Sequence, residues 1–191
     1  MPTIKGTQTE KNLLKAFAGE SQARNRYTYA ASVAKKEGYE QIAGVFQETA
    51  DQEKQHAKRF FRFLEGGMVE ITAAYPAGLT GTTIENLKAA AAGEHEEYSI
   101  LYPEFARIAK EEGFPQVAAQ FNSVSKAEQN HERRYRLVLE NLEKSSVFKK
   151  DASVKWICRE CGYIHEGPEA PKMCACCDHP QSFFQALSEV Y

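Results

Sequence analysis

Residues 53–56 read Glu-Lys-Gln-His, and residues 128–131 read Glu-Gln-Asn-His. In a helix, side chains three residues apart project from the same face, so each segment places a carboxylate beside an imidazole. Both pairs lie within apolar stripes that repeat every three or four residues, which is typical of a core-facing helix. Buried ionised groups are very costly unless they are paired or bind metal. The two Glu-x-x-His segments therefore predict a metal site inside a helical bundle.

Two further helical segments also carry glutamates on their apolar stripes. Glu20 lies on the first of them, and Glu94 and Glu97 lie on the second. Glutamates from two helices combined with Glu-x-x-His pairs from two others form the ligand set of a dinuclear metal centre in a four-helix bundle. The predicted ligands of this dinuclear centre are Glu20, Glu53, His56, Glu94, Glu97, Glu128 and His131.

Helix start and stop signals divide the first three quarters of the chain into two hairpins. The helices are expected from Thr7 or Thr9 to before Gly38, from about Tyr39 to Glu65, from a capping box at residues 82–85 to Gly113, and from Pro115 to Glu143, with a crossover at residues 66–81.

The second hairpin repeats the first with one additional residue near Tyr102. We predict that a π-bulge or kink between residues 97 and 105 absorbs this residue. The repeat also places Ala23 opposite Glu97, so the fifth carboxylate is expected to serve only one of the two metals.

All five cysteines lie between residues 158 and 177. Four of them form two C-x-x-C pairs, and four thiolates in this arrangement predict a tetrahedral site for zinc or a single iron ion. The spacing does not choose between these metals. The predicted ligands of this site are Cys158, Cys161, Cys174 and Cys177. Cys176, between the last two, is expected to point away from the metal.

Composition and length restrict the class of protein. The 191 residues include 24 basic and 26 acidic side chains, a balance that gives no sign of a nucleic-acid-binding surface. No apolar run approaches the roughly 18 residues of a membrane helix, and the first residues lack a secretory signal. We expect one domain over residues 1–146, a polar linker near residues 144–153, and a small cysteine module over residues 153–191. Clustered cysteines suit metal binding in a reducing cytoplasm.

These motifs resemble those of the rubrerythrin family along essentially the full length of the chain. The segments that carry the resemblance are residues 16–27, 48–56, 92–98, 128–131 and the first cysteine pair with the His-Glu-Gly that follows it. The resemblance implies an all-α ferritin-like four-helix bundle with two non-haem irons. A small rubredoxin-like β/loop domain, with one iron held by four cysteines, would follow this bundle.

The resemblance also implies an activity and its partners. Rubrerythrins are peroxidases that reduce hydrogen peroxide in defence against oxidative stress, with electrons from NAD(P)H through a reductase or a rubredoxin. The chain would then be cytoplasmic and form a head-to-tail homodimer, in which the cysteine site of one chain serves the di-iron site of the other. Tyr27 and Tyr102 match tyrosines close to that centre, and His56 matches an alternative to Glu97 as an iron ligand.

Charge gives a reason for this alternative, because exchanging Glu97 for neutral His56 would remove excess negative charge from a reduced, poorly solvated site.

Three other functions compete with peroxide reduction. The first is a ferritin-like ferroxidase that handles iron, for which the cysteine module is unnecessary. The second is an oxygenase, which would need a pocket for an organic substrate. The third is a simple electron carrier, which leaves the buried glutamates unexplained.

Overall fold

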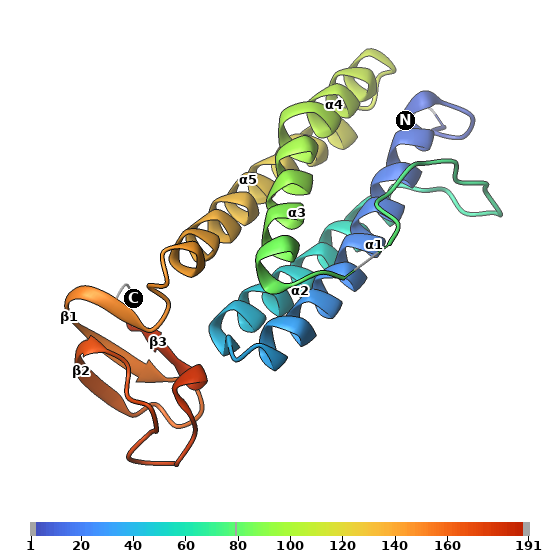
Figure 1. The fold of residues 1–191 in the computed structure, drawn as a ribbon. Coiled ribbons are helices and arrows are strands. Elements are labelled where there is room, and N and C mark those ends of the chain that lie inside the picture. The colour runs from blue at the N-terminus through green and yellow to red at the C-terminus, as the bar shows by residue number, and fades with distance from the viewer. Residues whose placement is uncertain (1–2, 79, 189–191) are drawn as a thin grey trace.

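The computed structural model describes residues 3–78 and 80–188. The helices are α1 (Gln8–Lys36), α2 (Glu40–Phe61), α3 (Thr83–Glu96), the π-helix η1 (Glu97–Leu101), α4 (Tyr102–Glu111), α5 (Pro115–Glu143) and the 3-10 helix η2 (Gln181–Phe183). The strands are β1 (Lys149–Cys158), β2 (Ile164–Glu169) and β3 (Phe184–Ala186). Because α3, η1 and α4 follow one another directly, the chain forms a four-helix bundle with a small sheet at one end (Figure 1). This architecture confirms the predicted fold class.

Local sequence explains most helix ends. The side chain of Thr7 accepts a hydrogen bond from the Glu10 backbone N–H, and Thr82 and Glu85 form the predicted capping box. These contacts satisfy N–H groups that the first helical turn leaves without a partner. Gly38 follows the end of α1 with a φ of 84°, a left-handed conformation that glycine adopts at low cost.

The second helix is shorter than the sequence indicated. The expected end was Glu65, but α2 ends at Phe61. The Glu65 carboxylate instead accepts hydrogen bonds from the Thr3 hydroxyl at 2.6 Å and from the Ile4 backbone N–H at 3.0 Å. This contact between distant parts of the chain ties the N-terminal segment to the end of the first hairpin.

The π-helix η1 confirms the predicted irregularity in the third helix. Tyr27 follows Glu20 by seven residues, about two helical turns, whereas Tyr102 follows Glu94 by eight. In an unbroken α-helix, the additional residue would rotate Tyr102 away from the Glu94 face by about 100°. The wider turn of Glu97–Leu101 absorbs this rotation, so both tyrosines point into the bundle.

The C-terminal sheet has the order β2-β1-β3, with both pairs antiparallel. The expected linker over residues 144–153 is wrong in its second half, because β1 begins at Lys149, which pairs with Glu169. Residues 150–153 are mostly exposed and form an irregular stretch between the pairs Lys149–Glu169 and Val154–Gly167. The outermost expected domain limits, residues 1 and 191, lie outside the described residues.

Two apolar clusters fill the bundle, one toward each end. Phe46 and Tyr135 belong to the cluster near the sheet, and Phe60 and Phe121 belong to the other. The ionisable side chains predicted to bind metal lie between these clusters and are shielded from water on both sides. In the described part of the chain, we find no helix with the length and apolar character that crossing a membrane requires.

Candidate metal centres

The four helices bring two groups of ligand atoms together in the middle of the bundle. Each group contains four side chains whose ligand atoms all lie within 4.8 Å of one another. The first consists of Glu20, Glu53, His56 and Glu128, and the second of Glu53, Glu94, Glu128 and His131. Glu53 and Glu128 belong to both groups, so two carboxylates connect two adjacent sites.

At the first site, three carboxylates converge on one imidazole nitrogen. The Nδ1 atom of His56 lies 3.0 Å from Glu128 Oε1, 3.1 Å from Glu53 Oε2 and 3.6 Å from Glu20 Oε2. Ligand atoms at about 2.0–2.2 Å from a shared metal ion lie about 3 Å from one another. These separations therefore suit one ion coordinated by all four side chains.

The second site repeats this geometry with the opposite oxygens of the shared carboxylates. The Nδ1 atom of His131 lies 2.7 Å from Glu128 Oε2, 3.1 Å from Glu53 Oε1 and 3.5 Å from Glu94 Oε2. Each shared carboxylate thus directs one oxygen toward each site. This is the arrangement that two bridging carboxylates adopt between paired metal ions.

Unsatisfied polar atoms show that these residues fit a pair of cations. Glu20, Glu94 and Glu128 are fully buried, and Glu53 is 1% exposed. A single imidazole nitrogen carries at most one proton, so it cannot satisfy three carboxylates. The buried atoms of the centre without a hydrogen-bond partner are Glu20 Oε2, Glu53 Oε1, Glu94 Oε2, both Glu128 oxygens and His131 Nδ1. Unpaired buried charge is costly, and metal cations at both sites would remove this cost.

The two tyrosines named from the resemblance lie directly against this centre. The Tyr27 hydroxyl donates a hydrogen bond to Glu94 Oε1 at 2.6 Å, and the Tyr102 hydroxyl donates one to Glu20 Oε1. Each tyrosine therefore contacts the glutamate of the opposite hairpin that belongs to only one of the two sites, which we call its terminal glutamate. The π-helix makes this crossed arrangement possible because it turns Tyr102 inward.

Glu97 is the one predicted ligand outside both groups of ligand atoms. It begins the π-helix, is half-buried, and lies beside the centre rather than within it. Loss of hydration and then the charge of Glu94 hold the pKa of Glu97 well above its usual range. The structure thus places His56, and not Glu97, against the bridging carboxylates.

Without metal, the centre holds protons at neutral pH. Burial and the charge of Glu53 raise the pKa of Glu94 to about 8. Burial opposes protonation of His131, but its contacts with Glu128 and Glu53 raise its pKa to about 12. Metal cations compete with these protons because carboxylate and neutral imidazole are the ligand forms.

We therefore expect metal uptake to release protons and to strengthen as the pH rises. Glu94 and His131 are protonated at pH 7 in the metal-free protein and deprotonated when metal is bound, so about two protons should leave per chain. Anaerobic calorimetry with ferrous iron in two buffers of different ionisation enthalpy measures this release. A binding heat that is the same in both buffers would contradict it.

A chain of polar contacts orients His131 from outside the centre. Its Nε2 atom lies 3.0 Å from Gln52 Oε1, while Gln52 Nε2 donates to Glu48 Oε1 at 3.4 Å. Arg134 in turn donates to Glu48 Oε2 at 2.5 Å. Because the Gln52 amide group donates to Glu48, its oxygen faces His131. His131 Nε2 must then carry the proton, which leaves Nδ1 free for metal.

Replacing Gln52 with leucine should therefore weaken the second site. Loss of such a supporting hydrogen bond typically costs about 10–100-fold in metal affinity. We expect Gln52→Leu to lose about one metal ion per chain to a competing chelator under conditions in which the wild type keeps both. Gln52→Glu keeps an acceptor and should retain both ions. Gln55→Leu, on the exposed face of the same helix, is the matched control.

The four predicted cysteines form a separate group beside the sheet. Their sulfur atoms lie within 4.8 Å of one another, with 3.8 Å between Cys158 and Cys177 and 3.6 Å between Cys161 and Cys174. A tetrahedral ion with bonds of about 2.3 Å to sulfur has edges of about 3.8 Å, so the group fits a single metal. Trp156 and Phe184 are fully buried beneath it.

The backbone around Cys176 supports this site, although its side chain does not. The thiol of Cys176 is exposed and lies outside the four-sulfur group. Burial opposes ionisation of Cys174, but hydrogen bonds from the backbone N–H groups of Cys176 and Cys177 lower its pKa to about 7. These donors favour the thiolate, which is the form that binds metal.

Sequence reasoning missed the residues that support the centre from outside. Gln52, Glu48 and Arg134 lie on polar helix faces, where such residues are normally solvated. Their spacing gave a weak signal, because Glu48 and Gln52 are four residues apart on one helix face and Arg134 is three residues after His131. Only the packing of α2 beside α5 shows that these faces meet.

Comparison with known proteins agrees with both sites. Residues 11–139 match the family model described as Rubrerythrin, and residues 156–185 match the model described as Rubrerythrin, rubredoxin-like domain. The chain is 61% identical to a rubrerythrin of Porphyromonas gingivalis over 99% of this chain and 94% of that protein. It is 54% identical to a rubrerythrin of Nitratidesulfovibrio vulgaris over 98% of each chain.

Solved structures agree with the fold. A mixed-valence state of nigerythrin aligns with a TM-score of 0.64 and 32% identity, over 97% of this chain and 92% of that chain. A Mycobacterium tuberculosis bacterioferritin aligns with a TM-score of 0.61 over 72% of this chain and 87% of that chain; at 18% identity it shows the ferritin-like fold alone. The dinuclear carboxylate centre and the four-cysteine site are consistent with the iron sites of rubrerythrins. This chain belongs to the rubrerythrin family.

Proposed function

We propose that this protein is a peroxidase that reduces hydrogen peroxide to water at a di-iron centre in the bundle and is re-reduced through iron at its four cysteines. The main support is that one chain combines two candidate metal sites, which share Glu53 and Glu128, with a separate group of four cysteines. A structural relative, nigerythrin, has been described in mixed-valence and all-ferrous states, so its metal is redox-active iron. Redox activity is what the proposed reaction needs.

The reaction consumes two electrons and two protons for each peroxide, breaks the O–O bond and forms two water molecules. When bound, the metal pair supplies the two electrons and polarises the peroxide. Glu20, Glu53, Glu94, Glu128 and the two histidines would hold the metals, with Glu97 available as a further ligand. Burial of these side chains limits the access of water to the reacting atoms.

Tyr102 and Tyr27 are the proposed catalytic side chains. Each is buried, with its hydroxyl proton on a hydrogen bond to a terminal glutamate, so each can orient that carboxylate and donate a hydrogen bond at the centre. Burial raises the pKa of both hydroxyl groups well above the usual range, so both keep their protons at neutral pH. They therefore act as donors and not as bases.

The cysteine module contacts its own bundle at a distance from the dinuclear centre. The Arg159 guanidinium packs over Gly44 on α2, and Tyr39 stacks on Phe148 with 6.2 Å between ring centroids. Glu53 lies nine residues beyond Gly44, about 14 Å along the helix axis. We propose a head-to-tail homodimer in which the cysteine module of the partner lies nearer to the dinuclear centre than the module of the same chain does. Electrons would come from NAD(P)H through a reductase or a rubredoxin, in the reducing cytoplasm.

The test uses full-length protein loaded anaerobically with iron. A peroxidase of this type should contain three irons per chain, two at the bundle and one at the cysteines, and the reduced protein should recover its thiolate–iron absorbance as peroxide is consumed. The competing ferroxidase function predicts that excess ferrous iron is oxidised and retained in a large hollow assembly. Retention of excess iron without consumption of peroxide would overturn the proposal.

A further inference from the structure

A cavity of about 250 Å³ lies against the dinuclear centre, between α1 and the segment formed by η1 and α4. Glu97 and Tyr102 form part of its wall, and Tyr75 and Ala74 of the crossover line it from outside. Tyr102 contacts Glu20 directly, so this one side chain separates the cavity from a candidate ligand. The cavity therefore leads from the molecular surface to Glu97 and to the tyrosine that covers Glu20.

Tyr75 is the crossover residue that lies over this cavity. Its neighbours at positions 73, 74, 76 and 77 are exposed, but Tyr75 itself is half-buried. Its hydroxyl donates to the backbone carbonyl of Lys15 at 2.5 Å, and its ring lies over Gly19, where an added Cβ would be 3.5 Å from Tyr75 Cε1. The ring therefore packs closely on the backbone of α1. The crossover is held to the bundle at this point.

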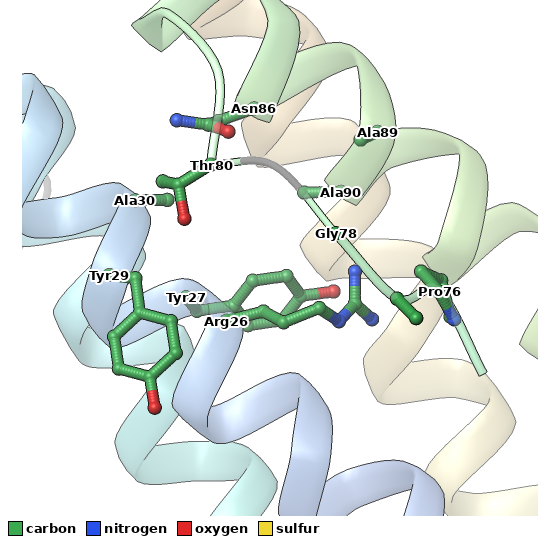
Figure 2. A pocket seen from close by; sticks show the side chains of 11 residues that line it. Arg26, Tyr27, Tyr29, Ala30, Pro76, Gly78, Thr80, Asn86, Ala89 and Ala90 are labelled. Atoms are coloured by element: carbon green, nitrogen blue, oxygen red, sulfur yellow. The ribbon is translucent and has the colours of Figure 1, made fainter.

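A second cavity of about 240 Å³ lies farther along the same crossover, and Figure 2 shows its lining. Arg26 extends across it toward Pro76 and Gly78, and the Tyr27 ring lies at its base (Figure 2). None of the candidate metal ligands lines this cavity. The Tyr27 hydroxyl is bonded to Glu94, as the Tyr102 hydroxyl is to Glu20. The two cavities are therefore similar in volume and in their tyrosine, but of the two only the first is lined by a predicted ligand, Glu97.

We propose that the cavity beneath Tyr75 is the entrance through which hydroperoxides reach the dinuclear centre, and that Tyr75 limits the size of the substrate. This inference rests on the peroxidase function proposed above. Glu97, the predicted ligand that lies beside the centre, is half-buried and forms part of the cavity wall. A hydroperoxide that passes Tyr75 meets Glu97 and Tyr102 first. The ring excludes alkyl hydroperoxides because it packs on Gly19 and lies across the entrance.

The two exposed alanines on either side of Tyr75 provide a matched test. Ala74 lines the proposed entrance, and Ala77 lines the second cavity. In iron-loaded, oxidised, full-length protein, azide serves as a probe whose binding to iron is followed by absorbance without turnover. Ala74→Trp should slow azide association by about fivefold or more, and Ala77→Trp should leave it within about twofold of wild type.

Substitutions of Tyr75 test the size limit. Tyr75→Ala should raise the kcat/KM for tert-butyl hydroperoxide relative to hydrogen peroxide by about tenfold or more, which is within the range that pocket shape can discriminate. Tyr75→Phe keeps the ring and should stay within about twofold of the wild-type ratio. Iron content and thermal unfolding of each variant verify that the centre is intact.

The outcomes separate this inference from the proposed function. Two results would overturn the proposed entrance. One is an equal rate of azide association in the two tryptophan variants, and the other is a Tyr75→Ala protein with wild-type azide kinetics and substrate ratio. Either result would point to access from another face, such as that of His56. If Ala74→Trp slows azide but no variant consumes peroxide, the peroxidase function fails while this entrance to the metals stands.

Discussion

Replacing Glu128 with glutamine should remove both metal ions from the bundle and abolish peroxide reduction. The two oxygens of Glu128 lie 3.0 Å from His56 Nδ1 and 2.7 Å from His131 Nδ1, so one substitution weakens both sites. Glutamine has the same shape but is neutral and can present only one oxygen. We expect activity to fall by at least about a hundredfold. Iron per chain and peroxide consumption measure the two effects.

The control for this prediction is Glu97→Gln. Glu97 lies outside both groups of ligand atoms, so its loss should leave two irons bound to the bundle. Two irons bound with normal affinity to the Glu128→Gln protein would show that the shared carboxylate does not bridge the sites. Circular dichroism distinguishes loss of metal from loss of the fold. We expect the fold of the Glu128→Gln protein to persist, because the amide occupies the volume of the carboxylate.

Replacing Cys161 with serine should stop steady-state turnover while sparing a single reaction with peroxide. Cys161 is exposed and lies 3.6 Å from Cys174, so the change removes one metal ligand with little loss of packing. Without iron at the cysteines, electrons no longer reach the dinuclear centre efficiently, and turnover with an NAD(P)H-linked donor should fall by at least about a hundredfold. Chemically reduced protein should still consume about one peroxide per dinuclear centre, since that centre stores two electrons.

Cys176→Ser is the matched control, because this thiol is also exposed but lies outside the four-sulfur group. Its backbone donors remain, so metal content and turnover should stay within about twofold of wild type. Normal steady-state turnover in the Cys161→Ser protein would show that electrons enter the bundle without the cysteine site. Loss of the single reaction with peroxide would show that the dinuclear centre depends on the module for its structure.

Much of the fold and of the metal chemistry is readable in the sequence because local rules control it. Capping residues, glycines and the spacing of apolar side chains predict the helices, and the additional residue near Tyr102 predicts the π-helix at Glu97–Leu101. Buried carboxylates in apolar stripes predict cations, and two C-x-x-C pairs predict a four-sulfur site. Errors occurred where long-range contacts decide, as at Glu65, which binds the N-terminal segment, and at Lys149, which pairs with β2.

The sequence by itself determined which side chains are available to bind metal, since residue type and helical spacing are local properties. Only the tertiary structure decided how these side chains are shared: Glu53 and Glu128 connect the two sites, and each tyrosine contacts the glutamate of the opposite hairpin. It also placed Gln52 against His131 and Tyr75 over Gly19. The physical reason is that these contacts join residues tens of positions apart, and their geometry follows from how the helices and the crossover pack against one another.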